Sequence, residues 1–374
     1  MPNPKKIIRP LWIEVDLAAL SSNFKAIKAY LEPKTKIIAT IKQSAYGHGL
    51  VPVAKQLKKD GVDIFGVGSI EEALALREAG FDSPVIVLTA VLSNFCNLFL
   101  EHKVIPTIVD LEFAKKLNRL AKKMGRKVAV HVKVDTGMGR LGFHYKQADQ
   151  FVRELAKLKN IILEGIYTHF PAADSDPGFT QYQIDAFNGF IEQLKTEGIS
   201  FKYQHCANSI GLLRYSHTYF NMVRPGLILY GVKPQAEVDI GIKPVLSLKS
   251  RIVFIKQVKK GSGVSYGRTY IAKNNRNIAT VAVGYADGYP WSLSNKSKVL
   301  IKGKFFELVG RVCMDHIMID LKGRSDIKVG EEVILIGESK TKKILAEDLA
   351  ELAQTIPYEI VSRLSERIPR IYKK

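Results

Sequence analysis

The feature that most constrains this fold is a regular alternation between short apolar runs and amphipathic segments across residues 36–224. Each run has the length of a buried strand, and the segment after it has helical periodicity. Strands joined by helical crossovers are parallel. The eight predicted strands are Lys36–Lys42, Ile64–Val67, Val85–Leu88, Val104–Val109, Lys127–Val134, Ile161–His169, Phe201–Cys206 and Asn221–Arg224. Eight such units predict an α/β fold, a (β/α)8 TIM-like barrel.

Polar residues mark two of the predicted helix starts. Asp16 ends the alternating run 12–16, which has the pattern of a half-buried strand, and is placed to cap the helix that follows. Ser69 is followed three residues later by Glu72. This is the capping-box pattern, in which each of the two side chains accepts a hydrogen bond from the other residue's backbone N–H.

The periodicity changes near Lys243-Pro244. Beyond this point, β-branched runs are separated by turns, and one helical segment occurs near Ala346–Leu352. We therefore expect residues 1–243 to form the barrel and residues 244–374 to form a mostly β C-terminal domain. Residues 12–16 are a candidate strand of that second domain.

The chain is strongly basic, with 56 Lys and Arg against 36 Asp and Glu and a formal net charge of +20. Such a charge raises nucleic acid or a membrane surface as a partner. The cations, however, are dispersed in small pairs and form no long run interleaved with aromatic residues. We therefore expect a solvated basic surface, with no nucleic acid and no membrane partner.

The three cysteines, Cys96, Cys206 and Cys313, are far apart in the sequence. Their odd number and wide spacing argue against a disulfide framework and against a zinc cluster, so we expect no metal site. No apolar run approaches the roughly 18 residues of a membrane helix. Because scattered cysteines fit a reducing compartment, the expected location is cytoplasmic.

Polar residues gather where five of the predicted strands end. Catalytic groups of (β/α)8 barrels lie at the carboxyl ends of the strands. Any single residue of this kind could be a satisfied core group, and for His131 or His205 alone that is the better interpretation. Together, however, they predict a catalytic site. The residues are Lys42; Lys133, Asp135 and Arg140; Tyr167, Thr168 and His169; His205, Asn208 and Ser209; and Arg224.

A set of motifs resembles those of alanine racemases, pyridoxal phosphate enzymes with a (β/α)8 barrel and a C-terminal β domain. The resemblance extends from Trp12 to Tyr372, and the motifs are specific in combination. They are Lys42 with Ala45–Gly49, Lys133–Gly142, Thr168–Phe170, Ala207–Ser209, Met222–Gly226, Val264–Gly267, Val283–Gly288, Cys313–Asp315 and Tyr358–Glu359.

The resemblance implies pyridoxal phosphate as cofactor and interconversion of L-alanine and D-alanine, the latter supplying peptidoglycan. The cofactor acts as an electron sink for the α-carbon. By resemblance, Lys42 forms an imine with the cofactor and later serves as the base on one face of that carbon. Tyr266 matches the second base on the opposite face. Two bases are needed because one alone returns the proton to the side it left.

The resemblance also implies a homodimer with shared active sites. In the family, the tyrosine matched by Tyr266 reaches the barrel of the partner subunit. Met314 and Asp315 match further residues that are contributed in the same way, and we assign them to substrate binding.

Several residues match the cofactor pocket of the family. Arg224 matches the residue that faces the pyridine nitrogen, to which an arginine can donate while keeping its own proton. His169 matches the residue bonded behind this arginine. The residues that match the phosphate cradle are Tyr46, Ser209, Tyr358 and the backbone of Gly226 and Leu227, with Asn208 beside them.

Lys133 and Arg140 would place two cations at one strand end, where like charges repel. In the family, the lysine carries a carbamate made from carbon dioxide, and the arginine binds the substrate carboxylate. The matching spacing extends this hypothesis to Lys133 as a modified lysine and to Arg140 as a substrate-binding residue.

Two positions depart from the family pattern. Gln43-Ser44 stand where the family usually has Ala-Asn, and Pro225 removes one backbone donor near the phosphate. The main alternative is a broad-specificity or serine racemase of the same superfamily, which the pocket residues could permit. A related decarboxylase would not need Tyr266. A non-catalytic carrier of the cofactor would lack the domain that begins near Leu246.

Overall fold

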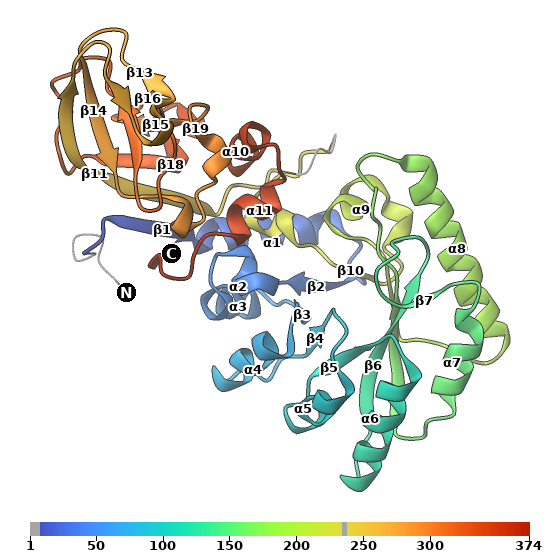
Figure 1. Ribbon diagram of the computed structural model, residues 1–374. Helices are drawn as coiled ribbons and strands as arrows, with labels where there is room; N and C mark the ends of the chain where they lie inside the picture. Colours follow the sequence, from blue (N-terminus) through green and yellow to red (C-terminus); the bar gives the residue numbers. More distant parts are fainter. Residues whose placement is uncertain (1–7, 234–237) are drawn as a thin grey trace.

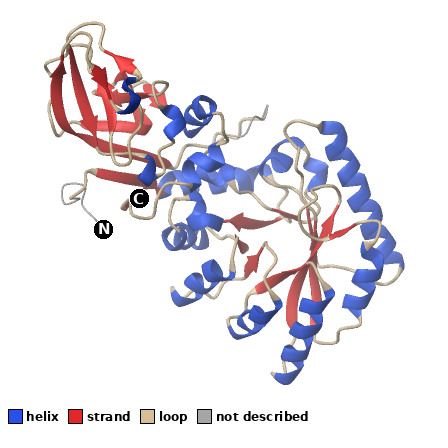
Figure 2. Cartoon of the chain, viewed as in Figure 1, coloured by secondary structure: helices blue, strands red, loops and turns tan. Residues whose placement is uncertain are grey.

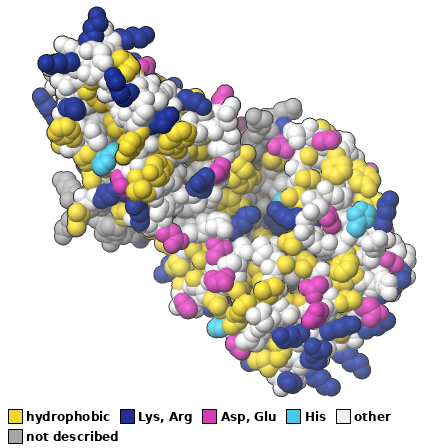
Figure 3. All heavy atoms as spheres, viewed as in Figure 1, with side chains coloured by type: hydrophobic (Ala, Val, Ile, Leu, Met, Phe, Trp, Pro, Cys, Tyr) yellow, Lys and Arg dark blue, Asp and Glu magenta, His cyan; other side chains and the backbone are white. Residues whose placement is uncertain are grey.

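The computed structural model describes residues 8–233 and 238–374. These residues form a barrel domain and a second domain beside it, shown at the lower right and upper left of Figure 1. Figure 2 shows helices around the strands of the barrel, whereas strands predominate in the second domain. On the face drawn in Figure 3, Lys and Arg side chains lie over both domains, among acidic and apolar ones.

Eight parallel strands form the barrel, and the predicted (β/α)8 architecture is confirmed. In spatial order they are β10 (Met222–Val223), β2 (Lys36–Thr40), β3 (Ile64–Val67), β4 (Val85–Val87), β5 (Ile105–Ile108), β6 (Val128–Asp135), β8 (Ile161–Tyr167) and β9 (Tyr203–His205). The short strand β7 (Phe143–His144) pairs with β6. Between β9 and β10 the ring is completed just beyond the strand ends, where the Arg224 N–H donates to the Ala207 carbonyl at 2.9 Å.

Helices follow the strands as the periodicity predicts. They are α1 (Leu17–Tyr30), the single turn α2 (Lys42–Tyr46), α3 (Leu50–Lys59), α4 (Ile70–Glu78), α5 (Cys96–Glu101), α6 (Leu111–Lys123), α7 (Ala148–Ala156), α8 (Pro177–Thr196) and α9 (Ser209–Arg214). None of the helices in the described part of the chain has the length and apolar content that a membrane span requires.

Helix α6 illustrates how the sequence directs this packing. Its buried residues, Phe113, Ala114, Leu117 and Ala121, recur at helical spacing and therefore share one face toward the barrel. Asp110 caps the helix by accepting a hydrogen bond from the Phe113 N–H at 2.7 Å. The lysines of the same helix consequently remain on the solvent side.

The second domain is mostly β, as predicted, and is centred on the long strand β11. Its strands are β1 (Leu11–Asp16), β11 (Leu246–Val258), β12 (Gly263–Val264), β13 (Tyr270–Ile271), β14 (Arg276–Val281), β15 (Lys298–Ile301), β16 (Lys304–Glu307), β17 (Ile317–Asp320), β18 (Glu332–Ser339), β19 (Lys342–Ile344) and β20 (Arg370–Lys373). Strand β1, the first of the chain, pairs antiparallel with β11 and parallel with β20.

Two local predictions differ from the structure. The pattern predicts one helix in the second domain, but α10 (Ala346–Ala353) is followed by α11 (Pro357–Ser362), which is too short to show helical periodicity. The capping box at α4 is only half formed. The Ser69 hydroxyl accepts from the Glu72 N–H at 3.3 Å, whereas the Glu72 carboxylate accepts from other backbone groups. By contrast, Asp16 caps α1 as predicted, at 2.8 Å from the Ala19 N–H.

Asn23 joins the barrel to the segment that leads into the second domain. Its buried amide donates to the carbonyls of Leu229 and Lys243 at 3.0 and 2.8 Å and accepts from the Lys243 N–H at 2.8 Å. Asn23→Ala leaves these three backbone groups without partners and should lower the free energy of unfolding by about 2–4 kcal/mol. Denaturant unfolding measures this loss. Asn97→Ala removes only a solvent-exposed hydrogen bond to Glu101 on α5, so this control should change stability by less than about 0.5 kcal/mol.

Candidate active site

A cavity of about 260 Å³ lies at the carboxyl end of the barrel strands. Its lining residues are Thr40, Lys42, Tyr46, Gly68, Leu88, Thr89, Lys133, Arg140, Leu141, Tyr167, His169, Asn208, Ser209, Arg224, Gly226, Leu227 and Tyr358. A wider surface hollow of about 740 Å³ lies over α1 and α3, but none of the polar residues at the barrel strand ends lines it. The cavity, which combines several titratable groups with a concave shape, is therefore the candidate active site.

Lys42 opens a turn of left-handed helix. Residues 43–46 all have φ between +51° and +55°, although none of them is glycine. The Ala45 N–H donates to the Ile41 carbonyl at 2.9 Å within this turn. Left-handed conformation costs roughly 1–2 kcal/mol for each such residue, so the surrounding structure must hold it in place. As a result, Lys42 and Tyr46 at the two ends of one turn both line the cavity.

The environment of Lys42 lowers the pKa of its amine. Burial lowers the pKa of Lys42, the charge of Arg140 lowers it further, and the Glu72 carboxylate opposes both. Within the described residues, Lys42 Nζ forms no hydrogen bond or ion pair with the protein. In its neutral form, such an amine can act as a nucleophile or as a base.

Arg224 is fixed by backbone carbonyls. Its guanidinium donates to the carbonyls of Thr168, Cys206 and His205 at 2.7, 3.0 and 3.0 Å. It also lies 2.5 Å from His205 Nδ1 and 3.3 Å from His169 Nδ1. Burial lowers the pKa of Arg224 to about 10, so it keeps its charge near neutral pH. Both histidines have lowered pKa values, chiefly through burial and then through this charge.

The ring of Tyr167 lies beneath two cations. Lys133 Nζ is 5.5 Å from its centroid, and the guanidinium carbon of Arg224 is 5.0 Å from it. The Tyr167 hydroxyl bonds Thr107 Oγ1 at 2.9 Å, and its ring stacks on His205 at 4.7 Å. Burial, followed by the Arg224 charge, lowers the pKa of Lys133 to about 7. The sequence gives Tyr167 no signal beyond its place at a strand end.

Hydroxyl groups meet at one corner of the cavity. The rings of Tyr46 and Tyr358 are 6.0 Å apart, and burial raises the pKa of both, so both phenols remain donors. Neither phenol has a hydrogen-bond partner in residues 8–233 or 238–374. A Cβ on Gly226 would lie 2.6 Å from the Tyr46 hydroxyl, so only glycine keeps this corner open. Uncharged donors around such a space fit a phosphate.

Three nearby polar residues are used by the fold. Asn208 caps α9, accepting from the Gly211 N–H at 2.9 Å, and donates to the Phe170 carbonyl at 3.3 Å. Ser209 accepts from the Gly226 N–H at 3.0 Å and so ties α9 to the turn after β10. Asp135, at the end of β6, accepts from three backbone N–H groups of residues 137–139 and shapes the loop that leads to Arg140.

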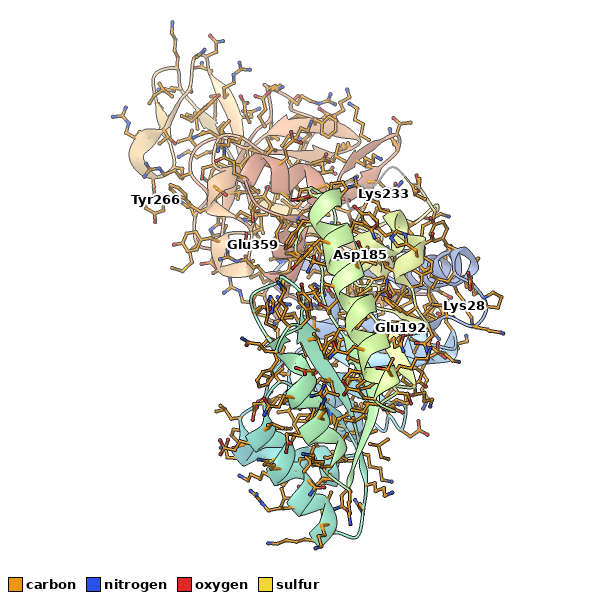
Figure 4. The ribbon with its side chains drawn as sticks, turned by 90° about the vertical axis from the view of Figure 1, so that its right-hand side faces the viewer. Lys28, Asp185, Glu192, Lys233, Tyr266 and Glu359 are labelled. Atoms are coloured by element: carbon orange, nitrogen blue, oxygen red, sulfur yellow. The ribbon has the colours of Figure 1, made fainter. Side chains whose placement is uncertain are left out.

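Three predicted site residues lie outside this cavity. Tyr266, Met314 and Asp315 belong to the second domain, and none of them lines it. Tyr266 is 70% exposed and Met314 is 54% exposed. Figure 4 shows Tyr266 at the outer edge of the second domain. A single chain thus brings the predicted cofactor-pocket residues together at the cavity, but it does not place the predicted second base, Tyr266, there.

The cavity of this (β/α)8 barrel brings together a half-buried lysine, an arginine bound to carbonyl groups and a glycine-lined corner of hydroxyls. These features define a class, the barrel-type pyridoxal phosphate enzymes. Residues 15–234 match the family model "Alanine racemase, N-terminal domain", and residues 245–372 match "Alanine racemase, C-terminal domain". The chain belongs to the alanine racemase family.

Curated relatives and solved structures agree with this assignment. The chain is 46% identical to an alanine racemase of Halothermothrix orenii, covering 99% of this chain and 98% of the relative. An alanine racemase structure from Clostridium difficile matches with a TM-score of 0.93 at 40% identity, covering 98% of this chain and 97% of that one. The Bacillus anthracis enzyme with bound L-Ala-P matches with a TM-score of 0.91 at 37% identity, covering 98% and 96%.

Gly226→Ala should weaken the binding of pyridoxal phosphate. The new methyl group would displace the Tyr46 hydroxyl from the corner of the cavity, and we expect the dissociation constant of the cofactor to rise about tenfold or more. Titration of the apoprotein, followed by cofactor absorbance, measures this change. Gly189→Ala is the control, because a Cβ at that position in α8 meets no atom within 4 Å. Equal affinity in both variants would contradict the assignment of this corner.

Proposed function

We propose that this protein interconverts L-alanine and D-alanine with pyridoxal phosphate as its cofactor. The observation that carries the proposal is the left-handed turn that places Lys42 and Tyr46 in one cavity with Arg224 and Tyr358. The membership of the chain in the alanine racemase family supports the same activity. Its product D-alanine would supply peptidoglycan synthesis, and its location would be cytoplasmic.

The cofactor pocket can be divided into three parts. Lys42 would hold the aldehyde carbon of the cofactor, and Arg224, with His169 behind it, would face the pyridine nitrogen. The phosphate would lie among Tyr46, Ser209, Tyr358 and the backbone of Gly226 and Leu227, with Asn208 supporting them. Pyridoxal phosphate, when bound, supplies an aldehyde that joins to amines and a conjugated ring that withdraws electrons from an α-carbon.

The residues of the chain divide the proton chemistry between two faces. Because the Lys42 amine has a lowered pKa, it can take a proton from, or return one to, the α-carbon on its own face. Arg224, fixed by three carbonyls, can donate a hydrogen bond without giving up a proton, so the ring nitrogen would stay unprotonated. Tyr266 would move the proton on the opposite face.

We further propose a homodimer in which Tyr266, Met314 and Asp315 enter the cavity of the partner subunit. Large side chains that one chain leaves exposed support this arrangement. Besides Tyr266 and Met314, they include Tyr285, Trp291 and Ile356, which are 46%, 53% and 59% exposed. Such a group of aromatic and apolar side chains marks an interaction surface. The domains would divide near residue 243, with β1 added to the sheet of the second.

Arg140 would bind the substrate carboxylate, and Lys133, modified to a carbamate, would hold Arg140 in place for it. A pKa of about 7 leaves a large share of the Lys133 amine neutral near neutral pH, and a neutral amine can add to carbon dioxide. The carbamate would bring a negative charge beside Arg140 and Arg224. It would thereby offset their charges and orient Arg140 toward the substrate.

A chiral assay of the purified protein with a panel of L-amino acids tests the proposed activity. We expect alanine to be racemised in preference to serine and other amino acids. Lys42→Ala should abolish cofactor attachment and lower kcat roughly a thousandfold. Tyr266→Phe should keep the cofactor bound but impair proton exchange on one face by a similar factor. Decarboxylation alone, or turnover of serine only, would refute the proposal.

Modification of Lys133 should depend on pH. Since only the neutral amine reacts with carbon dioxide, we expect carbamate occupancy to be high at about pH 8 and to fall at about pH 6, below the lowered pKa. Carbon NMR with labelled bicarbonate, supported by native mass spectrometry, measures the occupancy. Lys133→Ala is the control that should lose the signal and raise the KM for alanine roughly tenfold. A plain amine at both pH values would disprove the modification.

A further inference from the structure

We propose that Glu72 is a positioning residue of the active site, whose carboxylate holds the left-handed turn that carries Lys42. The inference deepens the proposed function, because it rests on the role given there to Lys42. Glu72 does not line the cavity and does not touch the space in which a ligand would bind. It acts on the backbone behind the lysine.

The carboxylate of Glu72 bridges two strand ends. Its Oε1 accepts from the Ser44 N–H at 2.9 Å, and its Oε2 accepts from the Gly68 N–H at 2.8 Å. Ser44 is in the left-handed turn after β2, and Gly68 directly follows β3. One side chain of α4 therefore fixes the turn after one strand to the end of the neighbouring strand.

A carboxylate suits this task for two reasons. The Ser44 N–H lies in the first turn of α2, where backbone donors lack a partner within the helix. A carboxylate has two acceptor oxygens, and hydrogen bonds to a charged group are about twice as strong as neutral ones. Glu72 accepts hydrogen bonds from both the Ser44 and the Gly68 N–H groups. In a complete capping box, it would accept from the Ser69 N–H instead.

Close packing transmits this anchoring to Lys42. A Cβ built on Gly68 would lie 3.1 Å from the Cβ of Lys42 and 3.5 Å from Glu72 Oε2. Gly68 thus lies between the two side chains with little free space. A shift of the Glu72 carboxylate would move Gly68 and Ser44, and the lysine would move with them.

The opposite side of the turn is held separately. His48 is fully buried, and its Nδ1 lies 3.0 Å from the Ala45 carbonyl and 2.9 Å from the Tyr46 carbonyl. Burial lowers the pKa of His48 to about 4, so it is neutral and donates one N–H to this pair of carbonyls. Glu72 therefore holds an N–H of the turn, whereas His48 holds its carbonyl groups. Loss of Glu72 should loosen the turn rather than unfold it.

Glu72 also contributes charge. Of the groups that shift the pKa of Lys42, burial and Arg140 lower it, and Glu72 raises it. His169 also interacts with Lys42, and burial lowers the pKa of His169 so far that the imidazole is neutral. Removing the Glu72 charge should therefore lower the pKa of Lys42 further. This effect distinguishes positioning of the lysine from general stabilisation of the fold.

The test compares Glu72→Ala and Glu72→Gln with Glu71→Ala, an exposed neighbour on the same helix. In the apoprotein, the backbone N–H groups of a peptide covering residues 42–49 should exchange with solvent roughly tenfold to a hundredfold faster in Glu72→Ala. This factor corresponds to the loss of one charge-assisted hydrogen bond. Cofactor affinity should fall by a similar factor. The Glu72→Gln side chain has a single amide oxygen, which can accept from one of the two N–H donors. Its exchange rate and cofactor affinity should therefore lie between those of the wild type and Glu72→Ala. Glu71→Ala should match the wild type.

The pH at which the Lys42–cofactor absorbance changes should be lower in Glu72→Gln than in the wild type. Unchanged exchange, affinity and pH dependence in Glu72→Gln would overturn the proposal, even if Glu72→Ala fails to fold. A lowered melting temperature with none of these changes would also overturn it, because it would show a purely structural role. None of these readouts uses alanine. A failure of the proposed racemase activity would therefore be seen separately in the chiral assay.

Discussion

Positive charge confined in one cavity is the constraint on which the rest of the site depends. Lys42, Lys133, Arg140 and Arg224 all line it, yet no carboxylate side chain of residues 8–233 or 238–374 does. Asp135 and Glu72 are nearby, but both bind backbone N–H groups. Carbonyl groups hold Arg224, and the face of Tyr167 lies against both Arg224 and Lys133. Such a site is stabilised by anionic ligands, and a phosphate, a carboxylate and a carbamate are all anions.

The barrel could be predicted because its signal is local and repeated. Several of the strands, such as β2, β3 and β4, are short and mostly buried apolar runs, and helices such as α6 present one apolar face. The same reasoning predicts that strand ends carry chemistry, and the cavity does include Lys42, Lys133, His169 and Arg224. The periodicity does not predict helix α11, because its six residues span less than two turns.

Contacts between distant segments could not be predicted. Ser69 and Glu72 have the spacing of a capping box, but the glutamate instead finds Ser44, which is 28 positions away. Nothing in the sequence around Tyr167 indicates that its ring lies against Lys133 and Arg224. The roles of Tyr266, Met314 and Asp315 came from resemblance alone, because no single chain places them at the cavity. Local pattern thus predicts the elements, whereas tertiary packing decides which polar groups meet.

The position of β1 has a consequence for how the chain is made. This strand is synthesised before the barrel, but its partners β11 and β20 follow the whole barrel in the sequence. On the ribosome, the barrel can therefore be completed while β1 still presents unpaired edges. Residues 244–374 expressed alone would lack the strand between β11 and β20, so the sheet of the second domain needs strands from both sides of the barrel in the sequence.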